Sequence, residues 1–350
     1  ESNLRSIRES IFTADCWRSF WIIVIGTLLL FLYKFKKLKA EYMVGAIAIL
    51  CLIDMWQVNK RYLNDEMFVE KSVREQAQPM TQTDRQILQD KSLDYRVLNL
   101  ASNTFNENET SYYHKSIGGY HAAKLRRYQE LIDAYISPEM QKMMPAIAKA
   151  GGDMTKVNGD SLFPVLNMLN AKYFIVPLQA NQTVAIENPY VYGNAWFVDK
   201  VTYVKNANEE LDTLGKLNLR HEAVADARFQ SQLGESKNQD STSIVKLTAY
   251  EPNQLTYDVR SATGGIVVFS EIFYPEWTAT VDGKPVEIGR VDYVLRALNV
   301  DKGHHKVVLT FDPKSVKQTE TVAYLSYGVL LLVVLFAVYF KRKEDKKAQA

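Results

Sequence analysis

Three long apolar stretches constrain this chain more than any other feature, because segments of that length need a membrane or a large core around them. They are residues 17–33, 42–58 and 322–340, and after Arg18 they contain a single charged residue, Asp54. At 1.5 Å per helical residue such stretches reach roughly 25–28 Å, about the thickness of a hydrocarbon core. We therefore expect three transmembrane helices. For the first two, which are short, a buried helical hairpin is the alternative.

Basic residues beside these stretches predict their orientation. The loop at 34–39 carries four lysines, and the tail at 341–350 carries four lysines and an arginine. Short cytoplasmic loops are enriched in Lys and Arg, and three spans place this loop and this tail on the same side, so the two signals agree. Residues 1–16, as a short flank, and the long segment 59–321 are then expected outside the cytoplasm, and 341–350 as a cytoplasmic tail.

The exported segment changes character along its length. Residues 59–91 are polar and indicate a linker with one short helix near residues 84–89, and residues 92–235 alternate helical and extended patterns, which indicates an α/β module. From 236 to 315 short strands alternate with turns such as Asp282-Gly283, which indicates a small antiparallel β-sandwich. The expected fold class is thus an α+β membrane protein with three transmembrane helices. In the α/β module we expect strands at 94–100, 172–177 and 194–204, and helices at 120–136, 137–150, 161–170 and 207–215.

Composition and missing motifs narrow the function. The formal net charge is +2, and basic residues concentrate beside the apolar stretches, so we expect no nucleic-acid partner. Both cysteines, Cys16 and Cys51, lie at or within the expected spans, so the exported segment uses no disulfides. The chain lacks a G-x-x-x-x-G-K-[ST] loop, a G-x-G-x-x-G fingerprint, H-E-x-x-H and G-x-S-x-G. We therefore expect neither a cofactor nor a metal.

Three stretches give the chain a family resemblance. They are YHKSIGGYHAAKLRRYQELID at 113–133, the segment 166–204 with LNMLNAKYFIVP and GNAWFVDKVTYV, and residues 273–313 with FYPEW, DGK and GHH. In these the chain resembles the YfhO family of bacterial membrane proteins, in the form found in Bacteroidetes. The resemblance implies the bacterial inner membrane, a fold like that of C-type glycosyltransferases, a polyprenyl-phosphate sugar as donor, and modification of a cell-envelope glycan or polymer on the periplasmic side.

One departure from that family pattern limits the expectation. In such folds the catalytic carboxylates lie in an early extracytoplasmic loop of a larger membrane bundle, and this sequence has three spans and no such loop. The resemblance therefore implies the C-terminal part of a longer protein, which needs the remaining N-terminal bundle as its partner. The catalytic residues are then unknown from this sequence. Whether the parent is an active enzyme stays open, and this part alone is expected to be inactive.

The stretch SIGGYHAAKLRRYQEL at 116–131 supplies the candidate ligand-binding site. A sugar transferase needs cations beside the departing phosphate, and guanidinium groups bind phosphate through two parallel hydrogen bonds. The glycine pair would let backbone N–H groups approach an anion, and a tyrosine would stack on the sugar. The alternative is a solvated helix face paired with Glu130 and Asp133. The predicted ligand-binding residues, on one helix, are Tyr120, His121, Lys124, Arg126 and Arg127.

The sequence offers weaker candidates for a functional site. Asp54 lies inside an expected span, where ionisable groups are often functional, but Trp56 marks an interface from which Asp54 would reach water. His114 and His121 have no further ligands at metal-binding spacing, so zinc is not expected.

The carboxylates Glu271, Glu276 and Asp282 could suggest a glycosidase pair. We favour core and turn roles for them. The alternatives to a transferase are a non-enzymatic envelope scaffold and a membrane-anchored glycan-binding module.

Overall fold

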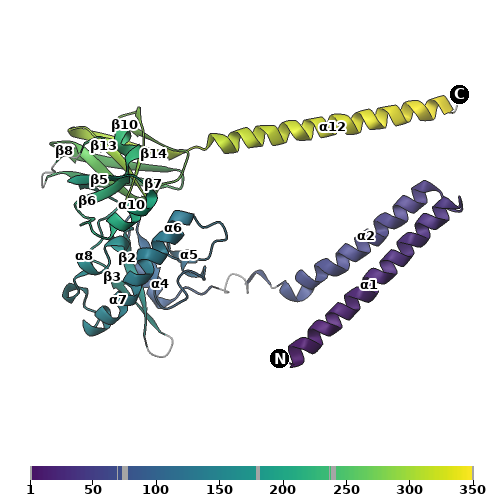
Figure 1. Ribbon diagram of the computed structural model, residues 1–350, viewed down its shortest axis with the longest axis horizontal. Coiled ribbons are helices and arrows are strands. Elements are labelled where there is room, and N and C mark those ends of the chain that lie inside the picture. The colour runs from purple at the N-terminus through teal and green to yellow at the C-terminus, as the bar shows by residue number, and fades with distance from the viewer. Residues whose placement is uncertain are drawn as a thin grey trace. The chain divides into compact units, whose positions relative to one another are not determined.

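The computed structural model describes residues 2–68, 70–72, 78–178, 182–235, 237 and 242–348. The chain divides into two compact units, Glu1–Pro79 and Met80–Ala350 (Figure 1).

The first unit is a helical hairpin. Helix α1 (Ser2–Lys34) and helix α2 (Ala40–Tyr62) lie side by side, and a tight turn joins them. The segments Arg5–Lys34 and Ala40–Met67 are long and apolar enough to span a membrane, and none of their apolar windows is buried in protein. Within the described chain nothing covers these helices, so the buried-hairpin alternative has no support there. Helix α1 also includes residues 2–16, the stretch expected as a flank.

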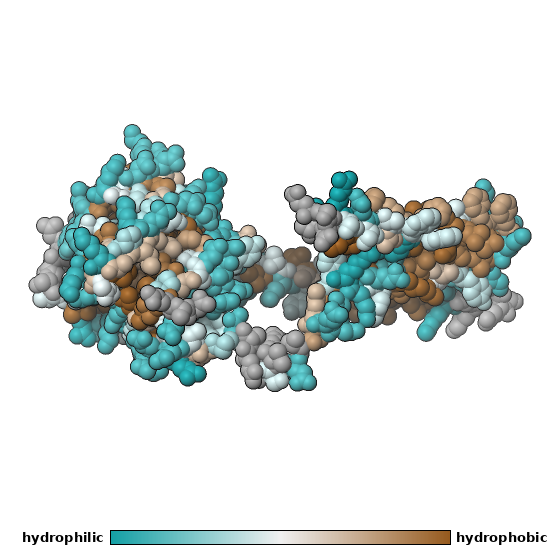
Figure 2. All heavy atoms as spheres, turned by 90° about the horizontal axis from the view of Figure 1, so that it is seen from below, coloured by the Kyte–Doolittle hydropathy of each residue, from teal (hydrophilic) through white to brown (hydrophobic). Residues whose placement is uncertain are grey.

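A third helix completes the membrane-spanning set. Helix α12 (Lys314–Ala348) contains the candidate span Lys314–Lys343, again with no burial of its apolar window. Figure 2 shows brown apolar atoms gathered over helical segments and teal polar atoms over most of the folded part. The prediction of three transmembrane helices is confirmed by length and composition.

The folded part of the second unit begins with a three-stranded sheet. Strand β1 (Arg96–Asn99) pairs in parallel with β2 (Ala171–Pro177), which pairs antiparallel with β3 (Thr183–Glu187). Alternate residues face opposite sides: Leu98 and Phe174 enter the main core, whereas Val97 and Ile175 pack with Ile87 of helix α4 (Gln82–Ile87). The short helix expected near residues 84–89 in the linker is thus present as α4, but it packs on the sheet and belongs to the folded part.

The helical region between β1 and β2 differs from the prediction. After the short helix α5 (Thr110–Tyr113), helix α6 (Arg126–Leu131) runs through a π-helical turn (Ile132–Ile136) directly into α7 (Ser137–Lys149). Residues 120–125 are therefore not helical, and no new helix begins at 137. The extra residue of a π-turn changes which side chains face the core. Two short helices, α8 (Gly159–Leu162) and α9 (Pro164–Met168), replace the single helix expected at 161–170.

The strand expected at 194–204 is divided between two sheets. Strand β4 (Ala195–Val198) pairs with β9 (Gly265–Ile272), whereas β5 (Lys200–Val204) pairs in parallel with β6 (Glu222–Asp226). Helix α10 (Ala207–Leu214) connects β5 to β6, and Asn206 caps its N-terminus. The short helix α11 (Gln230–Leu233) follows.

The remaining strands form two antiparallel sheets. A five-stranded sheet has the order β11-β10-β14-β8-β7 and a four-stranded sheet the order β12-β13-β9-β4. Asp282 and Gly283 both have positive φ, 51° and 78°, and make the hairpin turn between β10 and β11, as predicted. The bounds are β7 (Ile244–Glu251), β8 (Gln254–Ser261), β10 (Trp277–Val281), β11 (Lys284–Val286), β12 (Gly289–Val291), β13 (Leu295–Val300) and β14 (Gly303–Phe311).

The four-stranded sheet is covered on both faces. Val267 and Phe269 of β9 pack with residues of the five-stranded sheet, whereas Ile266 and Val268 join the core around α7 and β2. This double burial explains why β9 is almost entirely apolar. Through β9 the core around α7 and β2 adjoins the five-stranded sheet, although the sequence pattern changes near residue 236. The α+β fold class is confirmed.

Candidate functional site

Two adjoining cavities lie around the predicted ligand-binding residues. Cavity A, of about 670 Å³, is lined by Tyr120, His121 and Lys124 among others, and cavity B, of about 400 Å³, by Arg126 and Arg127 among others. The residues common to both linings are Leu125, Tyr128, Ile272 and Tyr274. The five residues chosen from the sequence therefore lie around one bipartite cleft.

Three of the five lie on a loop rather than on the predicted helix. The loop is fixed by its backbone: Gly119 N–H donates to the Thr104 carbonyl at 2.7 Å and Tyr120 N–H to the Glu107 carbonyl at 2.8 Å. A Cβ at Gly118 would lie 1.9 Å from the Thr104 oxygen, so only glycine allows this approach. Because these N–H groups bond within the protein, the glycine pair does not present them to an anion as predicted.

The loop side chains face outward. Tyr120 is 67% exposed, and His121 Nδ1 accepts a hydrogen bond from the Ala123 N–H at 3.1 Å, which leaves Nε2 as the donor. The Lys124 Nζ lies 5.6 Å from the Phe105 ring centroid, and the described residues give it no carboxylate partner. Cavity A thus contains one cation without a counter-charge in direct contact.

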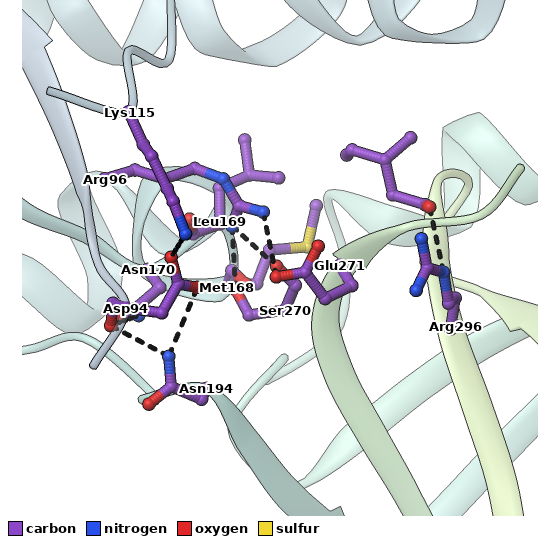
Figure 3. A network of polar contacts seen from close by, with 11 residues as sticks. Asp94, Arg96, Lys115, Met168, Leu169, Asn170, Asn194, Ser270, Glu271 and Arg296 are labelled. Carbon is purple, nitrogen blue, oxygen red and sulfur yellow. Dashed lines mark hydrogen bonds and ion pairs between the residues drawn. The ribbon is translucent and has the colours of Figure 1, made fainter. Parts of the chain in front are cut away.

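Arg96 is another cation that lines cavity A. Figure 3 shows its polar contacts. Its Nη1 donates to the carbonyl of Leu169 at 2.9 Å and to that of Ser270 at 2.5 Å, and Nη2 lies 3.5 Å from Glu271 Oε1. Burial raises the pKa of Glu271, and Arg96 offsets this only in part. Glu271 therefore serves as the buried partner of Arg96, in line with the core role that we favoured.

A second buried arginine, Arg296, contacts the backbone of Ile272, which lines both cavities. Arg296 Nε donates to the Ile272 carbonyl at 3.0 Å, and its guanidinium lies 3.8 Å from the Trp277 ring centroid. Burial lowers the pKa of Arg296 to about 10. The sequence analysis missed Arg96 and Arg296; the available signal was a charged residue inside an otherwise apolar strand.

Cavity B has guanidinium groups with shared partners. Arg126 pairs with Glu130 at 2.9 Å. Arg127 and Arg290 both contact Oε2 of the fully buried Glu210, at 3.2 and 3.0 Å. Arg290 and Glu210 were also missed by the sequence analysis, because strand β12 and helix α10 lie far from residue 127 in the chain.

Asp292, two residues beyond Arg290, is fully buried. One carboxylate oxygen accepts the Val224 N–H at 3.0 Å, and the other has no hydrogen-bond partner among the described residues. Burial, with Glu210 nearby, raises the pKa of Asp292 to about 8. Burial therefore favours the protonated form of this carboxyl group.

The lining of both cavities shares a charge pattern. Within the described chain it contains no Asp or Glu, and several tyrosines and a phenylalanine separate its cations. The lining cations are Arg96, Lys124, Arg126, Arg127 and Arg290. Such a lining suits a ligand that combines anionic groups with flat or apolar faces.

The loop Phe273–Glu276 connects the cleft to a membrane helix. Phe273, Tyr274 and Pro275 line cavity B, and Tyr274 also lines cavity A. The Glu276 carboxylate accepts the Ser315 N–H at 3.0 Å and the Ser315 hydroxyl at 2.5 Å, in the first turn of α12. Glu276 therefore caps α12, and Asp282 lies in the β10–β11 turn, as favoured above.

The remaining candidates have structural partners. Asp54 pairs with Arg18 of α1 at 3.0 Å, and the buried His114 pairs with Asp84 at 2.9 Å. Among the described residues no group of three or more His, Cys, Asp or Glu could hold a metal ion.

Comparison with known proteins adds one finding. The family model described as bacterial membrane protein YfhO matches residues 213–323, from the end of α10 into α12. This region includes Arg290, Asp292 and the loop Phe273–Glu276, but not the loop at 116–125. No curated protein and no solved structure matches the chain significantly.

Proposed function

We propose that this chain, a membrane protein of the YfhO family, forms the ligand-binding part of a polyprenyl-phosphate-dependent, glycosyltransferase-like protein that modifies a cell-envelope glycan or polymer. Its folded part binds and orients donor phosphate and acceptor glycan on the periplasmic face of the bacterial inner membrane. The lysine-rich loop and tail support that orientation. A preceding membrane bundle would provide the catalytic carboxylates.

The bipartite cleft is the observation that carries this proposal. Five cations without a lining carboxylate favour a phosphate-bearing ligand, because guanidinium and ammonium groups stabilise the charge that develops on a departing phosphate. Exposed aromatic faces such as Tyr120 and Tyr274 suit the flat face of a sugar ring. Lys124, which has no counter-charge in contact, is the residue of cavity A best able to bind phosphate.

Binding of a polyprenyl-phosphate hexose to the full chain in nanodiscs tests the proposal. K124A should weaken binding about 10-fold or more, since a hydrogen bond to a charged group contributes about 1.5–3 kcal/mol. K142A is the matched control, because Lys142 is exposed on α7 and lines neither cavity. Equal affinities for the two variants, or equal binding of the phosphate-free polyprenol, would contradict the proposal.

A glycan-binding module without transfer activity is the second candidate. The observation that favours it is the exposed aromatic rim, with Tyr120 67% and Tyr274 47% exposed. A neutral envelope glycan that binds with the same affinity to wild type and K124A would support this candidate over the first.

A further inference from the structure

The arginine pair of cavity B has an unusual charge arrangement. Arg127 Nη1 and Arg290 Nη2 approach the same oxygen, Oε2 of Glu210, at 3.2 and 3.0 Å. Glu210 is fully buried, Arg290 nearly so, and the Arg127 side chain is 29% exposed. One carboxylate thus serves two guanidinium groups at the border between the core and the cavity.

The other acidic residues near cavity B form no ion pair with Arg127 or Arg290 among the described residues. Glu130 accepts hydrogen bonds from Arg126 and from the Tyr293 hydroxyl, at 2.9 and 2.5 Å. Asp292 forms no ion pair with these arginines among the described residues: one oxygen accepts the Val224 N–H, and the other has no hydrogen-bond partner there. Arg126, Arg127 and Arg290 therefore share two carboxylates, those of Glu130 and Glu210.

Unpaired hydrogen-bonding atoms occur at the same place. Within the described chain, Arg290 Nε and Glu210 Oε1 are buried and have no hydrogen-bond partner. An unsatisfied buried donor is destabilising, so a donor on a cavity-lining side chain gains from an acceptor supplied by a ligand. Arg290 is such a residue.

Cavity A differs in this respect. The Arg96 guanidinium there is already bonded to two carbonyls and lies beside Glu271. The remaining cation, Lys124, lies on the outer loop, where water screens it. A charge attracts an anion more strongly at low dielectric, which favours cavity B over cavity A.

We infer that cavity B is an oxyanion subsite in which Arg127 and Arg290 together bind one phosphate group; Lys124 attracts the same group from the side of cavity A, and cavity A receives the remainder of the ligand. The Tyr293 ring, 4.4 Å from the Arg127 guanidinium carbon, keeps that group facing the cavity. The phosphate subsite stands on the geometry of cavity B, and only the identity of the rest of the ligand depends on the proposed function. The phosphate can belong to a lipid headgroup or to a soluble ester.

Charge-conserving variants test the arginine pair. Lysine keeps the charge but loses the forked donor geometry, so R127K and R290K should each weaken phosphate binding about 10-fold, the equivalent of roughly 1.4 kcal/mol. R228K is the matched control: Arg228 lies 4.9 Å from the ring centroid of Phe229 and Arg290 lies 5.1 Å from it, yet Arg228 does not line cavity B. Calorimetry would use the full chain in detergent, with inorganic phosphate and farnesyl phosphate as probes.

The outcomes separate this inference from the proposed function. A 10-fold loss in R127K and R290K but not in R228K supports the subsite; if farnesyl phosphate binds more tightly with the same loss, the phosphate comes from a lipid. Equal affinities in all three variants, or no phosphate binding by wild type, overturn it. If R290K unfolds, R127K decides, because the Arg127 side chain is 29% exposed and tolerates substitution better than the buried Arg290. The polyprenyl-phosphate hexose could fail to bind although R127K still weakens the binding of inorganic phosphate. That result would contradict the proposed function and leave the phosphate subsite intact.

Discussion

Replacing Asp292 by asparagine should stabilise the protein, and increasingly so as pH rises. Asp292 is fully buried, with one oxygen bonded to the Val224 N–H and the other unpartnered. Asparagine can keep the Val224 bond, and it tolerates the positive φ of 49° at this position. The substitution therefore removes a titrating group and retains the local geometry.

The sign of the effect follows from proton binding. The Asp292 pKa is about 8 in the folded protein, against an ordinary value of 3.8. Between these values the folded chain holds a proton that the unfolded chain has released, so raising the pH favours unfolding until the pH passes the folded pKa. At about 1.4 kcal/mol per pH unit, wild type should lose about 4 kcal/mol relative to D292N between pH 5 and pH 8.

Thermal unfolding of the full chain in detergent measures this difference. We expect the gap in melting temperature between D292N and wild type to widen by roughly 10 °C over that pH range. Glu139 also has a pKa raised to about 8 by burial, but it is present in both proteins and cancels. D133N, at an exposed carboxylate of the π-helical turn, is the control and should show a small, constant difference.

A constant difference between D292N and wild type from pH 5 to pH 8 would refute the reasoning. It would mean that Asp292 is ionised in the folded protein, so the arginine pair would have a second counter-charge.

Two further predictions concern the walls of the cleft. G118A should lower the stability by about 2 kcal/mol, because its Cβ would lie 1.9 Å from the Thr104 oxygen; thermal unfolding checks this against G45A, which meets nothing within 4 Å, and equal losses would be inconsistent with it. E276A should remove the cap of α12, cost about 1 kcal/mol, and speed amide exchange at Ser315 in hydrogen-exchange mass spectrometry; unchanged exchange would show that the cap is dispensable.

The sequence predicted those elements whose signal is local. The apolar stretches, the Asp282-Gly283 turn and the strands expected at 94–100 and 172–177 depend on neighbouring residues, and these were found close to the expected positions. The helix expected at 120–136 failed because its first residues follow Gly119, whose φ of 107° and bond to Thr104 hold a loop. The contact with Thr104 is not visible in a periodicity pattern.

The candidate site was predictable only where its residues are close together in the sequence. Tyr120 to Arg127 are close in sequence, so their clustering was apparent, and they do surround one cleft. Arg290 and Glu210 reach Arg127 only through the packing of β12 and α10. No spacing rule brings residues 127, 210 and 290 together, and without an alignment no covariation could suggest it.

The cap on α12 has a thermodynamic consequence. In the loop Phe273–Glu276 the first three residues line cavity B, and the fourth, Glu276, bonds to the first turn of a membrane helix. If a ligand binds in cavity B and moves this loop, thermodynamic linkage requires that the position of the helix turn and the affinity for the ligand affect each other equally.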